Sequence, residues 1–151
     1  MIKKLAVFAL LFFSISIISI SQETIVIKDA WVREVPPGSS VSAAYMTIVN
    51  NGGPDQLIAI SSDGAKDVEI HTSIVDENDV SRMEMLDSLD IKSGQTVEFK
   101  PGGMHLMLIG LNESLIGKEN VELKLEFKEA GEVVIQVPVK KDNNESHMHH
   151  H

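Results

Sequence analysis

The sequence contains no cysteine. That absence excludes disulfides, thiolate catalysis, thiolate metal sites and a lipid anchor on an N-terminal cysteine. It also excludes a blue-copper electron-transfer centre, because such a centre depends on a cysteine thiolate. A soft-metal site in this chain therefore has to be built from histidine, methionine and carboxylate side chains.

Aromatic and basic residues are also scarce. Aromatic side chains make up 5% of the chain, and we expect the single tryptophan and tyrosine, Trp31 and Tyr45, to anchor the core. The formal net charge is −9. If Lys3 and Lys4 are removed with a leader, 11 basic residues face 22 acidic ones, a charge of −11. We therefore expect no nucleic-acid partner, because phosphate binding requires positive charge.

The length of 151 residues suits one domain with a single core. Hydrophobic residues account for 43% of the chain and charged residues for 23%, which is typical of a folded globular protein. No internal repeat or interior linker interrupts the sequence. We therefore expect one domain, over residues 22–140.

The N-terminus has the pattern of a signal peptide. Lys3 and Lys4 precede an apolar run from Leu5 to Ile20, and Ser19 and Ser21 supply the small residues of a cleavage site. The run has about 16 residues, whereas a membrane-spanning helix needs about 20, so a retained anchor is the weaker alternative. We expect residues 1–21 to be cleaved, leaving an exported protein, periplasmic or otherwise extracytoplasmic, that is not integral to the membrane.

Residues 141–151 are polar and lack apolar periodicity, which predicts a disordered tail. The tail ends in His147-Met148-His149-His150-His151. Two interpretations remain open: a native segment that gathers metal, and a purification tag.

The rest of the chain is a series of short apolar or alternating runs separated by glycine, proline, asparagine and aspartate. This pattern predicts an all-β fold, and about ten strands at such spacing favour a two-sheet antiparallel sandwich. The predicted strands span residues 23–28, 30–34, 42–50, 56–61, 67–72, 81–87, 96–100, 105–111, 121–127 and 133–139.

Outside the tail the chain has two histidines, His71 and His105, and both lie in predicted strands. His105 and Met107 are two positions apart, so on a strand both side chains point to the same face. Met83 and Met85 repeat this spacing on another predicted strand. An imidazole and several thioethers can therefore converge, provided that the three strands are neighbours.

These donors favour Cu(I). Thioether and imidazole are soft or borderline ligands, whereas Ca²⁺ and Mg²⁺ prefer oxygen and structural zinc prefers thiolates or several histidines. The alternatives are ordinary ones, because methionine often fills a core and a strand histidine is often only a hydrogen-bonded residue. Spacing alone does not decide between them, since it does not show that the strands are adjacent.

The same residues resemble the metal-binding motif of the PCuAC family, the periplasmic copper chaperones of the Cu(A) centre. His71 is followed by Thr72, then ten residues, then Met83; twenty-one residues later come His105 and Met107. Each interval matches the family motif, in which the position of Thr72 is an optional methionine. Flanking similarities lie at residues 30–33, 36–38, 44–47 and 100–103, within a likeness that covers residues 25–139.

The resemblance implies a cupredoxin-like, antiparallel Greek-key β-sandwich. It further implies that His71, Met83, His105 and Met107 bind one Cu(I) ion. The recipient that it implies is the Cu(A) site in the copper-bearing subunit of cytochrome c oxidase, or another copper-assembly protein. Met85 and Met104 are additional thioethers outside this motif; we consider Met85 a candidate alternate ligand and expect Met104 to be a core or rim residue.

We expect no enzyme, since no nucleophile–base pair, phosphate loop or carboxylate pair stands out in the sequence. Two rival functions remain. One is periplasmic copper storage or resistance, with additional copper on the tail. The other is a metal-free interaction sandwich.

Overall fold

The computed structural model describes residues 24–75, 77–113 and 115–142. The predicted signal peptide and residues 143–151 of the predicted tail lie outside this part of the chain. Within it, no helix has the length and apolar composition needed to cross a membrane. The strands are β1 (Ile25–Arg33), β2 (Val41–Asn50), β3 (Asp55–Ser62), β4 (Ala65–Val75), β5 (Ser81–Leu86), β6 (Leu89–Ile91), β7 (Thr96–Phe99), β8 (His105–Leu111), β9 (Asn120–Phe127) and β10 (Gly131–Lys140).

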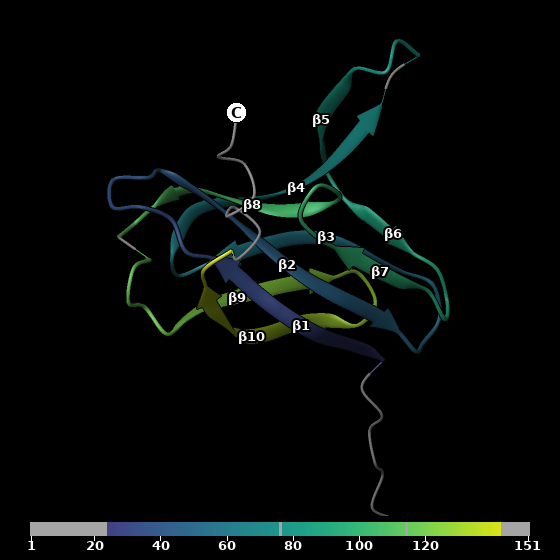
Figure 1. Ribbon diagram of the computed structural model, residues 1–151. Coiled ribbons are helices and arrows are strands. Elements are labelled where there is room, and N and C mark those ends of the chain that lie inside the picture. The colour runs from purple at the N-terminus through teal and green to yellow at the C-terminus, as the bar shows by residue number, and fades with distance from the viewer. Residues whose placement is uncertain (1–23, 76, 114, 143–151) are drawn as a thin grey trace, which may run out of the picture.

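The strands form two packed layers (Figure 1). One layer runs in the order β5-β4-β8-β2-β1, with β7 also paired to β2, and the other runs β10-β9-β3-β6. The layers join where β1 pairs with β10, and this short contact is parallel whereas the other pairings are antiparallel. The predicted all-β sandwich is confirmed; the single parallel contact was not expected.

The core lies between the inner faces of the two layers. In β9 the alternating residues Val121, Leu123, Leu125 and Phe127 are fully or almost fully buried, as their period of two predicts. From the opposite layer, Ile70 of β4 and Leu106 and Leu108 of β8 are buried against the same cluster. The inner faces of β4 and β8 are therefore fixed by core packing, whereas the side chains on their outer faces do not contribute to the core.

Two strand predictions were wrong. Residues 23–28 and 30–34 were predicted as separate strands but form the single strand β1. Asp29 takes a left-handed conformation (φ 52°) and the pairing with β2 shifts between Lys28 and Trp31, so a bulge produced the apparent break. Strand β6 was missed because three residues are too few to show a period.

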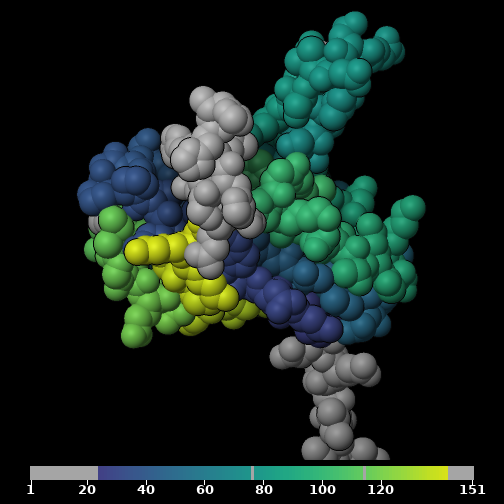
Figure 2. Space-filling view, viewed as in Figure 1, coloured from purple at the N-terminus to yellow at the C-terminus, as the bar shows by residue number. Residues whose placement is uncertain are grey.

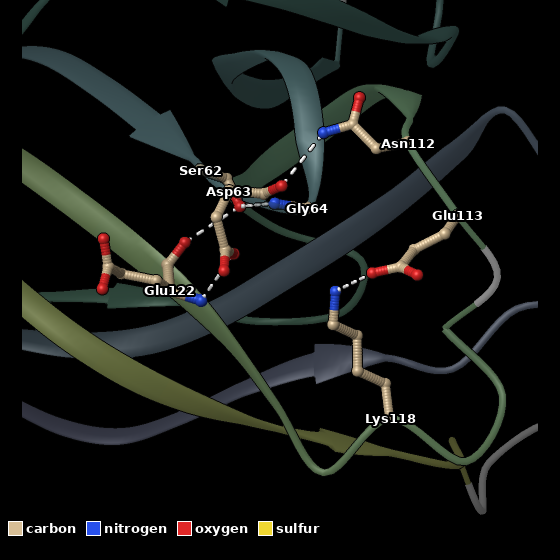
Figure 3. Close-up of polar contacts among 7 residues, drawn as sticks. All are labelled: Ser62, Asp63, Gly64, Asn112, Glu113, Lys118 and Glu122. Atoms are coloured by element: carbon tan, nitrogen blue, oxygen red, sulfur yellow. Dashed lines mark hydrogen bonds and ion pairs between the residues drawn. The ribbon is translucent and has the colours of Figure 1, made fainter.

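A polar corner fixes the passage from β3 in one layer to β4 in the other (Figure 3). Ser62 Oγ donates to the carbonyl of Glu122 at 2.9 Å, and Asp63 Oδ1 accepts from the amide of Glu122 at 2.9 Å. Asn112 Nδ2 donates to the carbonyl of Asp63 at 2.9 Å. A Cβ on Gly64 would lie 3.0 Å from a methyl of Val121, so the tight turn favours glycine. These contacts set where β4 begins.

Strands β4 and β5 form a hairpin that projects beyond the body of the sandwich (Figures 1 and 2). Strand β5 is an edge strand whose neighbour in the sheet is β4. Large apolar side chains are exposed along this hairpin: Ile74, Val75, Val80, Met83 and Met85.

We predict that Leu125→Ala lowers the free energy of unfolding by about 2–5 kcal/mol, because the side chain is fully buried and its removal leaves a cavity. Val134→Ala on the adjoining strand β10 is the matched control, since Val134 is 48% exposed. This substitution should change the free energy of unfolding by no more than about 0.5 kcal/mol. Urea denaturation of the metal-free protein measures both. Equal losses would contradict the assignment of the core.

Candidate metal centre

The pairing of β4 with β8 places His71 directly opposite His105. Their ring centroids are 5.8 Å apart and the ring planes are inclined by 35°. Both side chains point away from the core, because the residues next to them in sequence, Ile70 and Leu106, point into it and are buried. One ion could contact both rings, since a metal–imidazole bond is about 2 Å long.

Met107 lies two residues beyond His105 and therefore on the same outer face of β8. Its partner across the ladder is Glu69, which itself lies two residues before His71 on β4. Met107 is thus a diagonal neighbour of His71. The structure brings His71, His105 and Met107 together on one half-buried patch of the sheet.

Met83 lies farther out. In the β4–β5 ladder it is opposite Ser73, which is two residues nearer the hairpin tip than His71, and it is 65% exposed. A diagonal neighbour of this kind is about 7–8 Å away, which a long side chain can span. The residue directly opposite His71 is Met85. Met104 packs against the hydrophobic core, as predicted for a core or rim residue.

A carboxylate orients His71. Nε2 of His71 is 2.7 Å from Oε2 of Glu69. A carboxylate accepts, so Nε2 donates and Nδ1 keeps its lone pair. Nδ1 is buried and has no hydrogen-bond partner among the described residues. Metal-binding histidines typically donate their other nitrogen to a carboxylate or carbonyl, so this arrangement fits a ligand whose metal-binding atom is free.

A backbone carbonyl orients His105. Its Nδ1 donates to the carbonyl of Gly103 at 3.0 Å, which leaves Nε2 available. The carbonyl is positioned by a tight turn in which the amide of Gly103 donates to the carbonyl of Lys100 and Gly102 takes a φ of 77°. The glycines before His105 therefore have a structural purpose, since the turn needs a left-handed residue.

A shallow recess flanks the patch on the side of β1 and β2. It is lined by His105, Met107, Val35, Val41, Ser42, Ala43 and Arg33. Arg33 forms an ion pair with Asp142 at 2.7 Å, and the Asp142 side chain is only 8% exposed.

Arg33 also lies over the ring of Tyr45. Burial raises the pKa of Tyr45 above its usual 10.0, although the charge of Arg33 opposes this shift, so the phenol is neutral at physiological pH.

The donors on this patch are two imidazole nitrogens and thioethers. Within residues 24–75, 77–113 and 115–142, no three histidine, aspartate or glutamate side chains gather in a metal-site arrangement. The imidazole–thioether set suits Cu(I), which accepts soft neutral ligands.

Sequence reasoning missed two contributors. Glu69 was not singled out, although its i, i+2 spacing to His71 would have placed both on one strand face. The proximity of Arg33 to His105 had no signal in the sequence, because it depends on how β1 and β8 pack on the two sides of β2.

Comparison with known proteins identifies the family. The family described as LpqE-like, a lipoprotein-related group, matches residues 25–139. The chain belongs to the LpqE-like family. The match spans every strand of the sandwich and includes all four predicted ligands.

Two relatives of this LpqE-like chain are informative. Lxx21020 of Leifsonia xyli subsp. xyli, which is named as a lipoprotein, is 28% identical over 115 residues, covering 76% of this chain and 68% of that protein. Protein RP573 of Rickettsia prowazekii is 34% identical over 106 residues, covering 69% of this chain and 58% of that protein.

Solved structures share the LpqE-like fold. The copper-bound PCuAC domain of PmoF2 has a TM-score of 0.67 and 28% identity, covering 79% of this chain and 94% of that domain. The Cu(I) form of DR1885 from Deinococcus radiodurans has a TM-score of 0.65 and 27% identity, covering 83% of each chain. The predicted resemblance to PCuAC domains is therefore confirmed, and this fold carries copper in both of these structures.

We predict that, with both imidazoles neutral, the metal-free LpqE-like protein holds His71 protonated on Nε2 and His105 protonated on Nδ1, because Glu69 and the Gly103 carbonyl accept those protons. Long-range ¹⁵N–¹H correlation spectra distinguish the two forms. Glu69→Ala should give a mixture of forms at His71 and leave His105 unchanged. Protonation of His71 on Nδ1 in the unsubstituted protein would contradict the assigned contact.

Proposed function

We propose that this protein is an extracytoplasmic copper chaperone that binds Cu(I) through His71, Met83, His105 and Met107. The observation that carries the proposal is the His71–His105 pair with Met107 beside it, on a fold whose solved relatives include two copper-bound structures. Each histidine has one nitrogen held by an acceptor and the other free. These contacts support the proposal, because they would hold both metal-binding nitrogens in place before copper arrives.

The chemistry suits a compartment that oxidises thiols. Thioether and imidazole cannot be lost to disulfide formation, and the chain has no cysteine to be oxidised. The signal-peptide pattern of residues 1–21 and the lipoprotein name of the Leifsonia relative support an extracytoplasmic location. A site without thiolates also holds copper less tightly than a thiolate site, which favours handing the ion on.

We propose the Cu(A) site of cytochrome c oxidase as the recipient, following the resemblance to the PCuAC chaperones. Release would proceed by ligand exchange, with donors of the recipient replacing the exposed thioether of Met83 first and the half-buried imidazoles last. Met83, on the hairpin of β4 and β5, is 65% exposed, so it would be the most accessible of the four proposed ligands.

The first test is competitive Cu(I) titration of the full chain with serine at positions 147–151, so that the tail adds no ligands. His71→Ala combined with His105→Ala should lower Cu(I) affinity by at least about a hundredfold, because outer-shell changes alone cost 10–100-fold. Thr72→Ala, which changes the neighbouring residue on the opposite strand face, is the control and should leave affinity unchanged. Undiminished binding by the double variant would instead favour a metal-free interaction sandwich.

Copper storage is the second candidate, and the observation that favours it is the anchoring of Asp142. The ion pair with Arg33 holds the chain beside the recess that His105 and Met107 line, five residues before His147. The five residues from Asp142 to His147 would span at most about 18 Å when fully extended. We propose that this tail binds additional copper.

Stoichiometry and transfer separate the two candidates. We predict that the serine-substituted chain binds one Cu(I) tightly and passes it to the metal-free copper-bearing subunit of cytochrome c oxidase, and that the unsubstituted chain binds more. The copper content of each protein after chromatographic separation gives the result. Several tightly held ions that do not transfer would establish storage instead.

A further inference from the structure

Three residues form a continuous row across the outer face of the sheet. His71 is opposite His105 in the β4–β8 ladder and opposite Met85 in the β4–β5 ladder. Directly opposed residues of antiparallel strands have Cβ atoms about 4.5–5.5 Å apart and share one face. Met85 is thus closer in register to His71 than Met83, which is opposite Ser73.

Met85 does not fill the hydrophobic core, which is the usual role of a methionine on a strand. Met46 fills the core and is 2% exposed, whereas Met85 is 51% exposed on the outer face of an edge strand. Met85 also lines the same surface recess as Glu69, the carboxylate that orients His71. In the ladder register Met85 is therefore opposite His71 and diagonal to Glu69.

We infer that Met85 is a further copper ligand, which exchanges with Met83 as the ion enters and leaves. This inference rests on the proposed function. Met85 occupies the inner position beside His71, and Met83 the outer position, two residues nearer the hairpin tip. In each exchange one Cu–S bond forms as another breaks. Copper remains Cu(I) and no proton moves, because a thioether is neutral in both states.

The geometry also explains why exchange would be easy. Both thioethers lie on one face of β5, where Ser81 is the next residue in the row, and both are solvent-exposed. The ion can move along β5 without crossing a charged side chain of that face. His105 and Met107, on the central strand β8, stay in place during this movement.

The test uses Met83→Leu, Met85→Leu and the double variant in the chain with serine at positions 147–151. Leucine keeps the apolar volume, and both sites are exposed, so the fold is unaffected. Copper-edge X-ray absorption should show that Met83→Leu retains the sulfur scattering of Met85 and Met107, and that the double variant loses part of it. Each single variant should weaken Cu(I) binding by about tenfold or less, and the double variant by about a hundredfold or more, because each thioether substitutes for the other.

Met104→Leu is the matched control, since Met104 packs against the core, and it should bind Cu(I) like the parent. The inference is overturned if Met85→Leu binds like the parent and Met83→Leu alone shows the full sulfur loss of the double variant. That result leaves the proposed function intact. Failure of the proposed function looks different, because binding would then survive alanine at both His71 and His105.

Discussion

The ladder between β4 and β8 is the constraint on which the rest of the site depends. A slip of one residue in an antiparallel ladder moves every side chain to the other face. Here such a slip would bury His71 and expose Ile70. The slip is prevented because Ile70, Leu106 and Leu108 fit the core between the layers, and because the corner at Ser62–Gly64 fixes where β4 starts. Hydrophobic packing on one face thus determines the geometry of the polar groups on the other.

Much of the fold could be predicted from the sequence. The alternation of Val121, Leu123, Leu125 and Phe127 defined a strand with one buried face, and the glycine and proline turns marked its neighbours. The strand prediction failed at Asp29, because an aspartate is a common turn residue and its position in a β-bulge cannot be recognised from the sequence. The parallel contact between β1 and β10 joins residues more than a hundred positions apart, and no local pattern carries that information.

The site was predicted in part. The spacing of His105 and Met107 was enough to place them on one strand face. The adjacency of β4, β5 and β8 was beyond sequence reasoning, because it follows from how the whole sandwich closes. The interval from His71 to Met83 fits the family motif, yet it conceals that Met85 occupies the position directly opposite His71, since register depends on the length of the hairpin loop.

The candidate ligands stand on the outer face of a sheet whose inner face is already packed. Many small metal sites are built the other way, so that the apo chain is unfolded and binding energy is folding energy. Under the proposed function, by contrast, the bound copper would contribute nothing to the packing of the fold. Under the proposed function, copper would therefore bind and leave without partial unfolding, and the metal-free protein would stay folded and resist proteolysis and aggregation. The same separation lets the ligand set vary over evolution at little cost to the stability of the scaffold.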